Sequence, residues 1–166
     1  YYTGFLYAGL MITADGTPKV IEYNCRFGDP ETQPVLLRLK SDLVSHCMAA
    51  LNNSLNREKV EWETRKSLGV VMASGGYPGN YSNNHPILGL EDISSKYGHK
   101  VFHGGTKFAN DRLVTNGGRV LCVTALGDSL EDAKTSAYEL VSKISWENVQ
   151  YRTDIGWRAI EKNREN

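Results

Sequence analysis

Three side chains in the stretch 20–33 are spaced so that they could bind a divalent cation together with a phosphate group. If this stretch is a β-strand, Glu22 and Asn24 point to the same face and lie about 6–7 Å apart along the backbone. Carboxylate and amide oxygens are ligands for hard cations, and Mg²⁺ usually takes only one or two protein groups, with phosphates and water completing its coordination. Arg26 lies on the same side if the strand continues that far, and its guanidinium suits phosphate oxygens.

The triplet alone has an ordinary alternative explanation. Glu-x-Asn occurs in many strands by chance, and Glu22 could simply be a solvated side chain. The residues that follow favour the functional interpretation, because Gly28-Asp29-Pro30-Glu31 cannot continue a strand and is expected to form a loop that opens a helix. The N-terminus of a helix presents free N–H groups and the positive end of a dipole to anions.

A hairpin is expected to position these side chains. Residues 6–12 alternate in a pattern that predicts a well-buried strand. Asp15-Gly16 is a strong turn signal, and residues 19–25 are predicted to return as the second strand.

Two helices are expected after the loop. The first covers residues 31–39, with Pro34 near its start, where proline costs least. Ser41 is expected to cap the second, over residues 42–51. The apolar face of that second helix is predicted to consist of Leu43, Val44, Cys47, Met48 and Leu51.

The rest of the chain is predicted to be mainly β. A hairpin is expected in which residues 113–115 pair with 119–125 through the turn Asn116-Gly117-Gly118. A final helix is expected to begin at Asp128 or Ser129, with Glu131 or Asp132 completing a capping box. Its apolar positions recur at helical spacing: Ala133, Ala137, Leu140, Val141 and Ile144.

The polar stretch 52–57 interrupts these patterns and predicts a domain boundary. The fold class is therefore expected to be α+β, with residues 1–58 completing one lobe and residues 59–166 forming a compact β-rich domain with a flanking helix. Because the chain begins in strand-like sequence without an initiator methionine, it is expected to start inside a domain.

Composition narrows the function classes. The 166 residues carry 19 Lys and Arg against 19 Asp and Glu, and zero net charge argues against a nucleic-acid surface. No apolar run approaches the roughly 20 residues that cross a bilayer, so no membrane partner is expected. Three widely spaced cysteines, Cys25, Cys47 and Cys122, form neither a zinc pattern nor a disulfide framework. A cytoplasmic location is expected.

The stretch EYNCR resembles the ATP-grasp signature E-x-N-x-R, and the longer string PKVIEYNCRFGDPETQ is similar to the phosphoribosylamine–glycine ligase (glycinamide ribonucleotide synthetase) family. Other ATP-grasp families share E-x-N-x-R but lack the GDPETQ continuation. The resemblance covers nearly the whole chain, because four later stretches also resemble the carboxyl-terminal half of that family in the same order: LGVVMASGGYPGNY, KVFHGGTKF, VTNGGRVLCVTALG and YRTDIGWRAIE.

The resemblance implies an activity. The family joins glycine to 5-phosphoribosylamine in de novo purine biosynthesis, converts ATP to ADP and phosphate, and proceeds through glycyl phosphate. Glu22 and Asn24 match the positions of the family's Mg²⁺ or Mn²⁺ ligands, and Arg26 is expected to steady the transferred phosphoryl group. Many ATP-grasp enzymes carry another metal-binding acid on the preceding strand, which would fall near residues 8–10 here; no acid stands there, so the resemblance does not imply a symmetric two-metal site.

Gly28, Asp29, Pro30 and Glu31 are expected on the substrate side of the site. From charge, Asp29 or Glu31 is the candidate to attract the ammonium group of glycine. In the family, the lysines and the glycine-rich loop that grip ATP lie upstream of this region, together with the phosphoribosylamine domain. The chain alone is therefore expected to be inactive without the amino-terminal part of the same enzyme, and its other partners are small molecules.

Three questions stay open at this point. Thr106, Gly117, Gly118 and Arg119 could face the substrate, although Asn-Gly-Gly is first of all a turn. A different ATP-grasp ligase or carboxylase would share E-x-N-x-R, and a non-catalytic β-rich interaction module would leave Glu22 incidental. The oligomeric state is not indicated.

Overall fold

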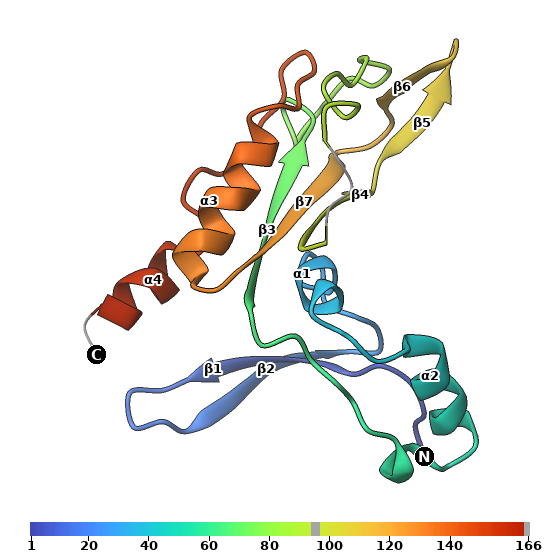
Figure 1. Ribbon diagram of the computed structural model, residues 1–166, viewed down its shortest axis with the longest axis vertical. Coiled ribbons are helices and arrows are strands. Elements are labelled where there is room, and N and C mark those ends of the chain that lie inside the picture. Colours follow the sequence, from blue (N-terminus) through green and yellow to red (C-terminus); the bar gives the residue numbers. More distant parts are fainter. Residues whose placement is uncertain (94–96, 165–166) are drawn as a thin grey trace. The chain divides into compact units, whose positions relative to one another are not determined.

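The computed structural model describes residues 1–93 and 97–164, which form two compact units (Figure 1). The first unit comprises Tyr1–Thr32 and Leu39–Trp62, and the second comprises Gln33–Arg38 and Glu63–Asn166. The sheets are antiparallel and the helices few, which confirms the predicted α+β class. The domain boundary expected at residues 58 and 59 stays a prediction. No helix in the described ranges combines the length and apolar character needed to cross a bilayer.

The first unit contains the expected hairpin. Strand β1 (Tyr7–Ile12) pairs antiparallel with β2 (Pro18–Asn24), and Gly16 takes a positive φ of 84° in the loop between them. The predicted burial of the first strand is wrong, because Leu10 is 47% exposed and Ile12 59% exposed. Alternation marks the side chains that could be buried, but burial needs a covering layer. Among the described residues, the principal packing contact of each strand is the other strand.

Helix α1 (Thr32–Leu37) and helix α2 (Leu43–Leu51) follow, and a short 3₁₀ turn covers Leu55–Arg57. The expected cap of α2 at Ser41 is wrong. Asp42 caps the helix, because its carboxylate accepts the backbone N–H of Ser45 at 2.7 Å.

The hydroxyl of Ser41 has other partners. It lies 2.7 Å from Nε2 of His46 and accepts the backbone N–H of Glu61 at 3.1 Å. These contacts use the oxygen that would otherwise cap the helix, so the neighbouring Asp42 takes that role.

Much of the predicted apolar face of α2 is exposed. The buried residues of this helix are His46 and Ala49, whereas Val44 is 67% and Leu51 is 68% exposed. Helical spacing gives the same stripe whether it faces a core or solvent. The contact of Ser41 with His46 lies on the buried side of the helix within this unit.

The second unit is built on a three-stranded sheet. Strand β7 (Arg119–Gly127) lies in the centre between β3 (Lys66–Ala73) and β4 (His99–His103), and both neighbours run antiparallel to it. Helix α3 (Leu130–Val141) packs against β3 and β7, and a further helix, α4 (Trp157–Arg164), follows it (Figure 1).

The core of this unit lies between the sheet and α3, and the apolar positions that recur at helical spacing in this segment, with Ile144 just after the helix, are all buried. The buried apolar side chains include Leu68, Val70, Met72, Val120, Leu121, Val123, Ala125, Ala133, Ala137, Leu140, Val141 and Ile144.

The hairpin predicted between residues 113–115 and 119–125 is wrong. Strand β6 (Arg112–Thr115) pairs with β5 (Thr106–Ala109) in a separate two-stranded sheet, whereas β7 pairs with β3 and β4. The turn between β5 and β6 is made by Asn110 and Asp111, whose φ angles are 49° and 57°. A two-residue hairpin turn whose twist matches the strands needs positive φ at both central positions, and Asn and Asp tolerate that conformation.

The capping box of α3 is confirmed. The Ser129 hydroxyl accepts the backbone N–H of Asp132 at 3.0 Å, and the Asp132 carboxylate accepts the backbone N–H of Ser129 at 3.0 Å. Two otherwise unpaired backbone donors are thereby satisfied at the start of the helix that covers the sheet.

We expect Ser129→Ala to lower the free energy of unfolding of the second unit by about 1 kcal/mol, because one N–H loses its acceptor. Urea unfolding followed by circular dichroism measures this. The control is Thr135→Ala, at an exposed position of the same helix, which should not lower stability. An equal loss in both variants would contradict the role assigned to the cap.

Candidate functional site

The pairing of β1 with β2 places the two predicted metal ligands on one face of the hairpin. Three consecutive pairs are regular: Tyr7 with Asn24, Ala8 with Tyr23, and Gly9 with Glu22. The register shifts only beyond this point, between Gly9 and Leu10. Side chains alternate along a regular strand, so those of Glu22 and Asn24 share a face and that of Tyr23 lies on the other.

The donor set on this face fits a hard divalent cation. Glu22 is exposed and Asn24 half-buried, and neither side chain makes a hydrogen bond to another described residue. A Cβ built on Gly9 would lie 3.1 Å from Cγ of Glu22, so the glutamate side chain extends over the glycine of the facing strand. One carboxylate and one amide oxygen leave the remaining positions of a cation to phosphates and water.

Within the described ranges, no group of three or more His, Cys, Asp or Glu side chains could hold a metal ion. A cation held here would therefore rely on the mixed pair of Glu22 and Asn24. Their role as ligands stays a prediction.

Arg26 does not follow the alternation of the strand. Strand β2 ends at Asn24, and the chain bends at residues 25 and 26. The guanidinium of Arg26 donates from Nη1 to the carbonyl oxygen of Phe27 at 2.8 Å, and the side chain is exposed. Arg26 would share the face of Glu22 only if the strand continued to residue 26, and it ends before that point. Its catalytic role stays a prediction.

Gly28 fixes the loop between β2 and α1. It is buried, and its carbonyl oxygen accepts hydrogen bonds from both the backbone N–H and the hydroxyl of Thr32. A Cβ at this position would lie 2.8 Å from the ring of Tyr7 and 2.6 Å from a carboxylate oxygen of Glu31. Glycine is required here because the backbone passes so close to an aromatic ring.

The remaining predicted substrate residues stand on the surface of the same loop. Asp29, Pro30 and Glu31 are all exposed and belong to the same compact unit as Glu22. The ring of Phe27, one residue before Gly28, stacks on Phe5 with centroids 4.0 Å apart and supports the loop from within that unit. The structure therefore presents two exposed carboxylates on the loop that follows β2, and their contact with substrate stays a prediction.

The residues of the carboxyl-terminal part whose contact with substrate was left open all belong to the second unit: Thr106, Gly117, Gly118 and Arg119. The two glycines have structural roles. A Cβ at Gly118 would meet the ring of Tyr77 at 2.1 Å. The carbonyl oxygens of Gly117 and Gly118 accept hydrogen bonds from the hydroxyl and the backbone N–H of Ser74, each at 2.8 Å.

The other two of these residues lie at strand ends. Thr106 begins β5 and pairs with Thr115, and Arg119 begins β7. A contact of any of the four with substrate stays a prediction.

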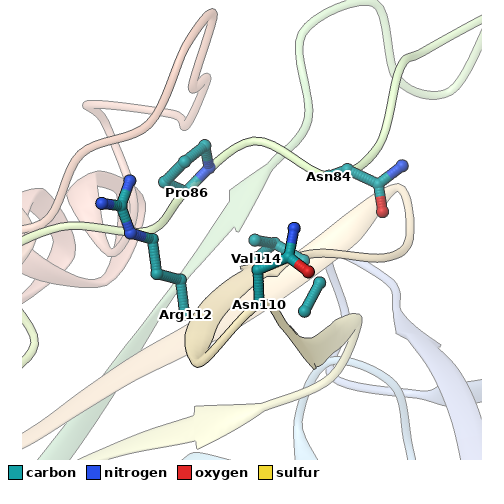
Figure 2. A pocket seen from close by; sticks show the side chains of 6 residues that line it. Asn84, Pro86, Asn110, Arg112 and Val114 are labelled. Carbon is teal, nitrogen blue, oxygen red and sulfur yellow. The ribbon is translucent and has the colours of Figure 1, made fainter.

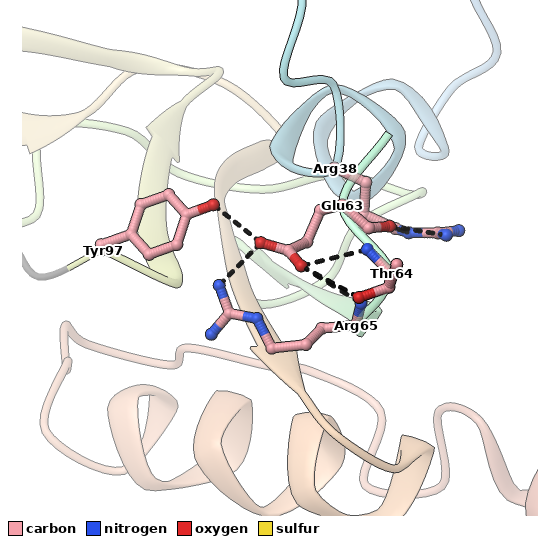
Figure 3. A network of polar contacts seen from close by, with 5 residues as sticks. All are labelled: Arg38, Glu63, Thr64, Arg65 and Tyr97. Atoms are coloured by element: carbon pink, nitrogen blue, oxygen red, sulfur yellow. Dashed lines mark hydrogen bonds and ion pairs between the residues drawn. The ribbon is translucent and has the colours of Figure 1, made fainter. Parts of the chain in front are cut away.

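A polar network that no sequence pattern indicated lies in the second unit (Figure 3). One carboxylate oxygen of Glu63 accepts hydrogen bonds from Tyr97 at 2.7 Å and from Arg65 at 2.9 Å, and the other accepts the backbone N–H of Thr64. Arg38 donates to the backbone oxygen of Glu63 at 3.0 and 3.2 Å. The hydrogen bond from Arg65, followed by that from Tyr97, lowers the pKa of Glu63 to about 2.

A pocket of about 510 Å³ also lies in the second unit, between the segment around residue 85 and the β5–β6 hairpin (Figure 2). Asn84, Asn110 and Arg112 contribute its polar groups, and Pro86 and Val114 much of its apolar surface. None of the residues predicted to bind metal or substrate lines it.

A hairpin ending in Glu-x-Asn-x-Arg, followed by a small β-rich unit with a helix on its sheet, defines the class of the chain: it carries the end of an ATP-grasp domain. Residues 1–32 match the family model described as "Phosphoribosylglycinamide synthetase, ATP-grasp (A) domain". Residues 67–158 match the model described as "Phosphoribosylglycinamide synthetase, C domain". The chain therefore belongs to the phosphoribosylglycinamide synthetase family.

Individual relatives support membership of this family. The chain is 59% identical over 164 residues to the phosphoribosylamine–glycine ligase of Escherichia coli strain K12, with 98% of this chain and 38% of the relative covered. It is 56% identical to the ligase of Vibrio parahaemolyticus, with 99% and 38% covered. A crystal structure of the phosphoribosylamine–glycine ligase of Thermotoga maritima superimposes with a TM-score of 0.77 at 34% identity, covering 90% of this chain and 36% of that one. The chain thus spans well under half the length of the relatives it matches.

We expect the Glu63 network to make stability depend on pH. The folded pKa lies below the unfolded value of 4.5, so the carboxylate contributes stability above that value and loses it as the pH falls towards about 2. Glu63→Gln should therefore lower the melting temperature at pH 7, and the difference from the unmodified protein should shrink between pH 4.5 and 2.

Thermal unfolding followed by circular dichroism across this pH range measures the difference. The matched control is Glu91→Gln, at an exposed acid that makes no hydrogen bond to another described residue. A melting-temperature difference for Glu63→Gln that stays constant from pH 7 to pH 2 would contradict the assignment.

Proposed function

We propose that this chain is the carboxyl-terminal part of an ATP-dependent ligase that joins glycine to 5-phosphoribosylamine in de novo purine biosynthesis. The observation that carries the proposal is the shared strand face of Glu22 and Asn24, directly before the Gly28–Glu31 loop. Family membership supports the proposal, because the two family models match both parts of the chain in order. It also favours this ligase over the other ATP-grasp ligases, the carboxylases and the interaction module that the sequence alone left open.

The proposed reaction begins with attack of the glycine carboxylate on the γ-phosphate of ATP, which gives glycyl phosphate and ADP. The amine of phosphoribosylamine then attacks the acyl carbon, and inorganic phosphate leaves. Phosphoryl transfer of this kind depends on positioning and on neutralisation of the phosphate charge. Glu22 and Asn24 would hold Mg²⁺ or Mn²⁺, which supplies that neutralisation when bound.

The chain's own residues have separate proposed tasks. Arg26 is exposed on the bend after β2, where release of its hydrogen bond to the Phe27 carbonyl would free the guanidinium for phosphate oxygens. Asp29 or Glu31, both exposed on the loop, would attract the ammonium group of glycine by charge. Gly28 keeps this loop against Tyr7, so the two carboxylates stay next to the strand that carries Glu22.

Activity is proposed for the longer protein and not for this chain alone. The chain covers 38% of the length of its curated relatives, so residues outside it would supply the groups that bind the nucleotide and phosphoribosylamine. Its proposed partners are those small molecules and that amino-terminal part. The expectations of a cytoplasmic location and of no nucleic-acid partner stay predictions.

The test is release of ADP by the full-length protein with glycine and ATP, with phosphoribosylamine omitted and then restored. Glu22→Ala should lower turnover on the order of a hundredfold or more, because charge neutralisation at the transferred phosphate is lost. Raising the Mg²⁺ concentration should not restore it fully.

The matched control is Glu61→Ala, which removes an exposed acid of the same unit whose side chain pairs with Lys59. Its turnover should equal that of the unmodified protein, and both variants should keep the unmodified circular dichroism spectrum. Full activity of Glu22→Ala would remove the metal-ligand assignment. No dependence of ADP release on glycine would contradict the proposed substrate.

A further inference from the structure

Three side chains of the second unit form a hydrogen-bonded chain that the proposed ligase reaction does not use. The hydroxyl oxygen of Ser82 lies 2.6 Å from Nε2 of His85, and Nδ1 of the same ring lies 3.1 Å from a carboxylate oxygen of Glu147. Ser82 and His85 are three residues apart, whereas Glu147 follows 62 residues after the histidine. The order of groups is hydroxyl, imidazole, carboxylate.

The carboxylate selects the ring tautomer that a general base needs. Glu147 can only accept a hydrogen bond when ionised, so Nδ1 of His85 donates its proton to it. Nε2 then carries the lone pair and accepts the hydroxyl proton of Ser82. These are the hydrogen bonds that activate a serine nucleophile in acyl-transfer enzymes. Such a triad is identified by its geometry and not by the order of its residues in the sequence.

The backbone holds His85 in place and leaves Ser82 accessible. The N–H of His85 donates to the hydroxyl of Thr115 at 3.2 Å, and its carbonyl oxygen accepts the N–H of Thr115 at 3.0 Å. The histidine side chain is 18% exposed, whereas Ser82 lies on the surface. The backbone N–H groups of Ser82 and Asn83 donate to no other described residue.

The first unit contains a second serine–histidine pair, Ser41 and His46, that lacks both a hydrogen-bonded carboxylate and an exposed serine. Ser41 lies 2.7 Å from Nε2 of His46, but the hydroxyl also accepts the backbone N–H of Glu61. Nδ1 of His46 is 3.8 Å from Glu58, beyond hydrogen-bond reach. Neither Ser41 nor His46 is exposed. Of these two pairs, only Ser82 and His85 combine a carboxylate that orients the histidine with an exposed serine.

We propose that Ser82, His85 and Glu147 form a nucleophilic site at which Ser82 takes up the acyl group of small activated esters and the phosphonyl group of related electrophiles. As the Ser82 oxygen attacks the carbonyl carbon, its proton passes to Nε2 of His85. The bond from that carbon to the alcohol oxygen breaks, and the alcohol leaves with the proton from the imidazolium. Water, deprotonated by His85, then releases the carboxylic acid and regenerates Ser82.

A tagged fluorophosphonate tests this on the full-length protein. The Ser82 oxygen forms a bond to phosphorus, fluoride leaves, and the hydroxyl proton goes to solvent through His85. Mass spectrometry of the digested protein should place the tag on Ser82, and Ser82→Ala should abolish that label. His85→Gln should slow labelling about a hundredfold, the effect of losing a general base.

Controls separate activation from ordinary exposure. Ser142→Ala removes an exposed hydroxyl that donates to the carbonyl oxygen of Glu139, and labelling at Ser82 should keep its rate. Glu147→Gln alters a side chain that is 71% exposed, so it should fold normally and still slow labelling measurably. Absence of label at Ser82 overturns the proposal. So does labelling at the unmodified rate in His85→Gln or, if that variant does not fold, in Glu147→Gln.

Discussion

The regular cross-strand pairing of residues 7–9 with residues 22–24 is the constraint on which the proposed metal site depends. It fixes the alternation of β2 and so places Glu22 and Asn24 on one face, with the shift in register falling just beyond Gly9. The loop that follows is held equally firmly, because the Gly28 backbone passes against the ring of Tyr7 and accepts two hydrogen bonds from Thr32. Strand and loop thereby hold a mixed carboxylate and amide donor pair and, a few residues later in the chain, two exposed acids.

The second unit has its own hydrophobic core. The central strand β7 is paired on both edges, and α3 seals one face with small and aliphatic side chains. One carboxylate oxygen of Glu63 accepts hydrogen bonds from both Arg65 and Tyr97. These bonds connect the segment before β3 to the segment before β4. In this unit the two glycines that the sequence left open, Gly117 and Gly118, have structural roles, and the backbone of Gly118 passes close to the ring of Tyr77.

Sequence predicted the features whose causes are local. The capping box of Ser129 and the buried positions of α3 follow from spacing within one helix, and E-x-N-x-R with its GDPETQ continuation indicated the family. Sequence failed where the outcome depends on distant segments. Strand β7 pairs with β3, which lies far earlier in the chain, and not with the neighbouring β6, and Glu63 meets Tyr97 from 34 residues away. None of these partners leaves a periodic signal in the chain.

Binding of Mn²⁺ to the full-length protein in the presence of ATP tests the central claim most directly. The free ion can be counted by electron paramagnetic resonance, and Mn²⁺ accepts the same oxygen ligands as Mg²⁺. The account predicts that Glu22→Gln and Asn24→Ala each weaken binding, while Glu61→Gln, at an exposed acid of the same unit, leaves it unchanged. Unchanged Mn²⁺ affinity in both Glu22→Gln and Asn24→Ala would contradict it.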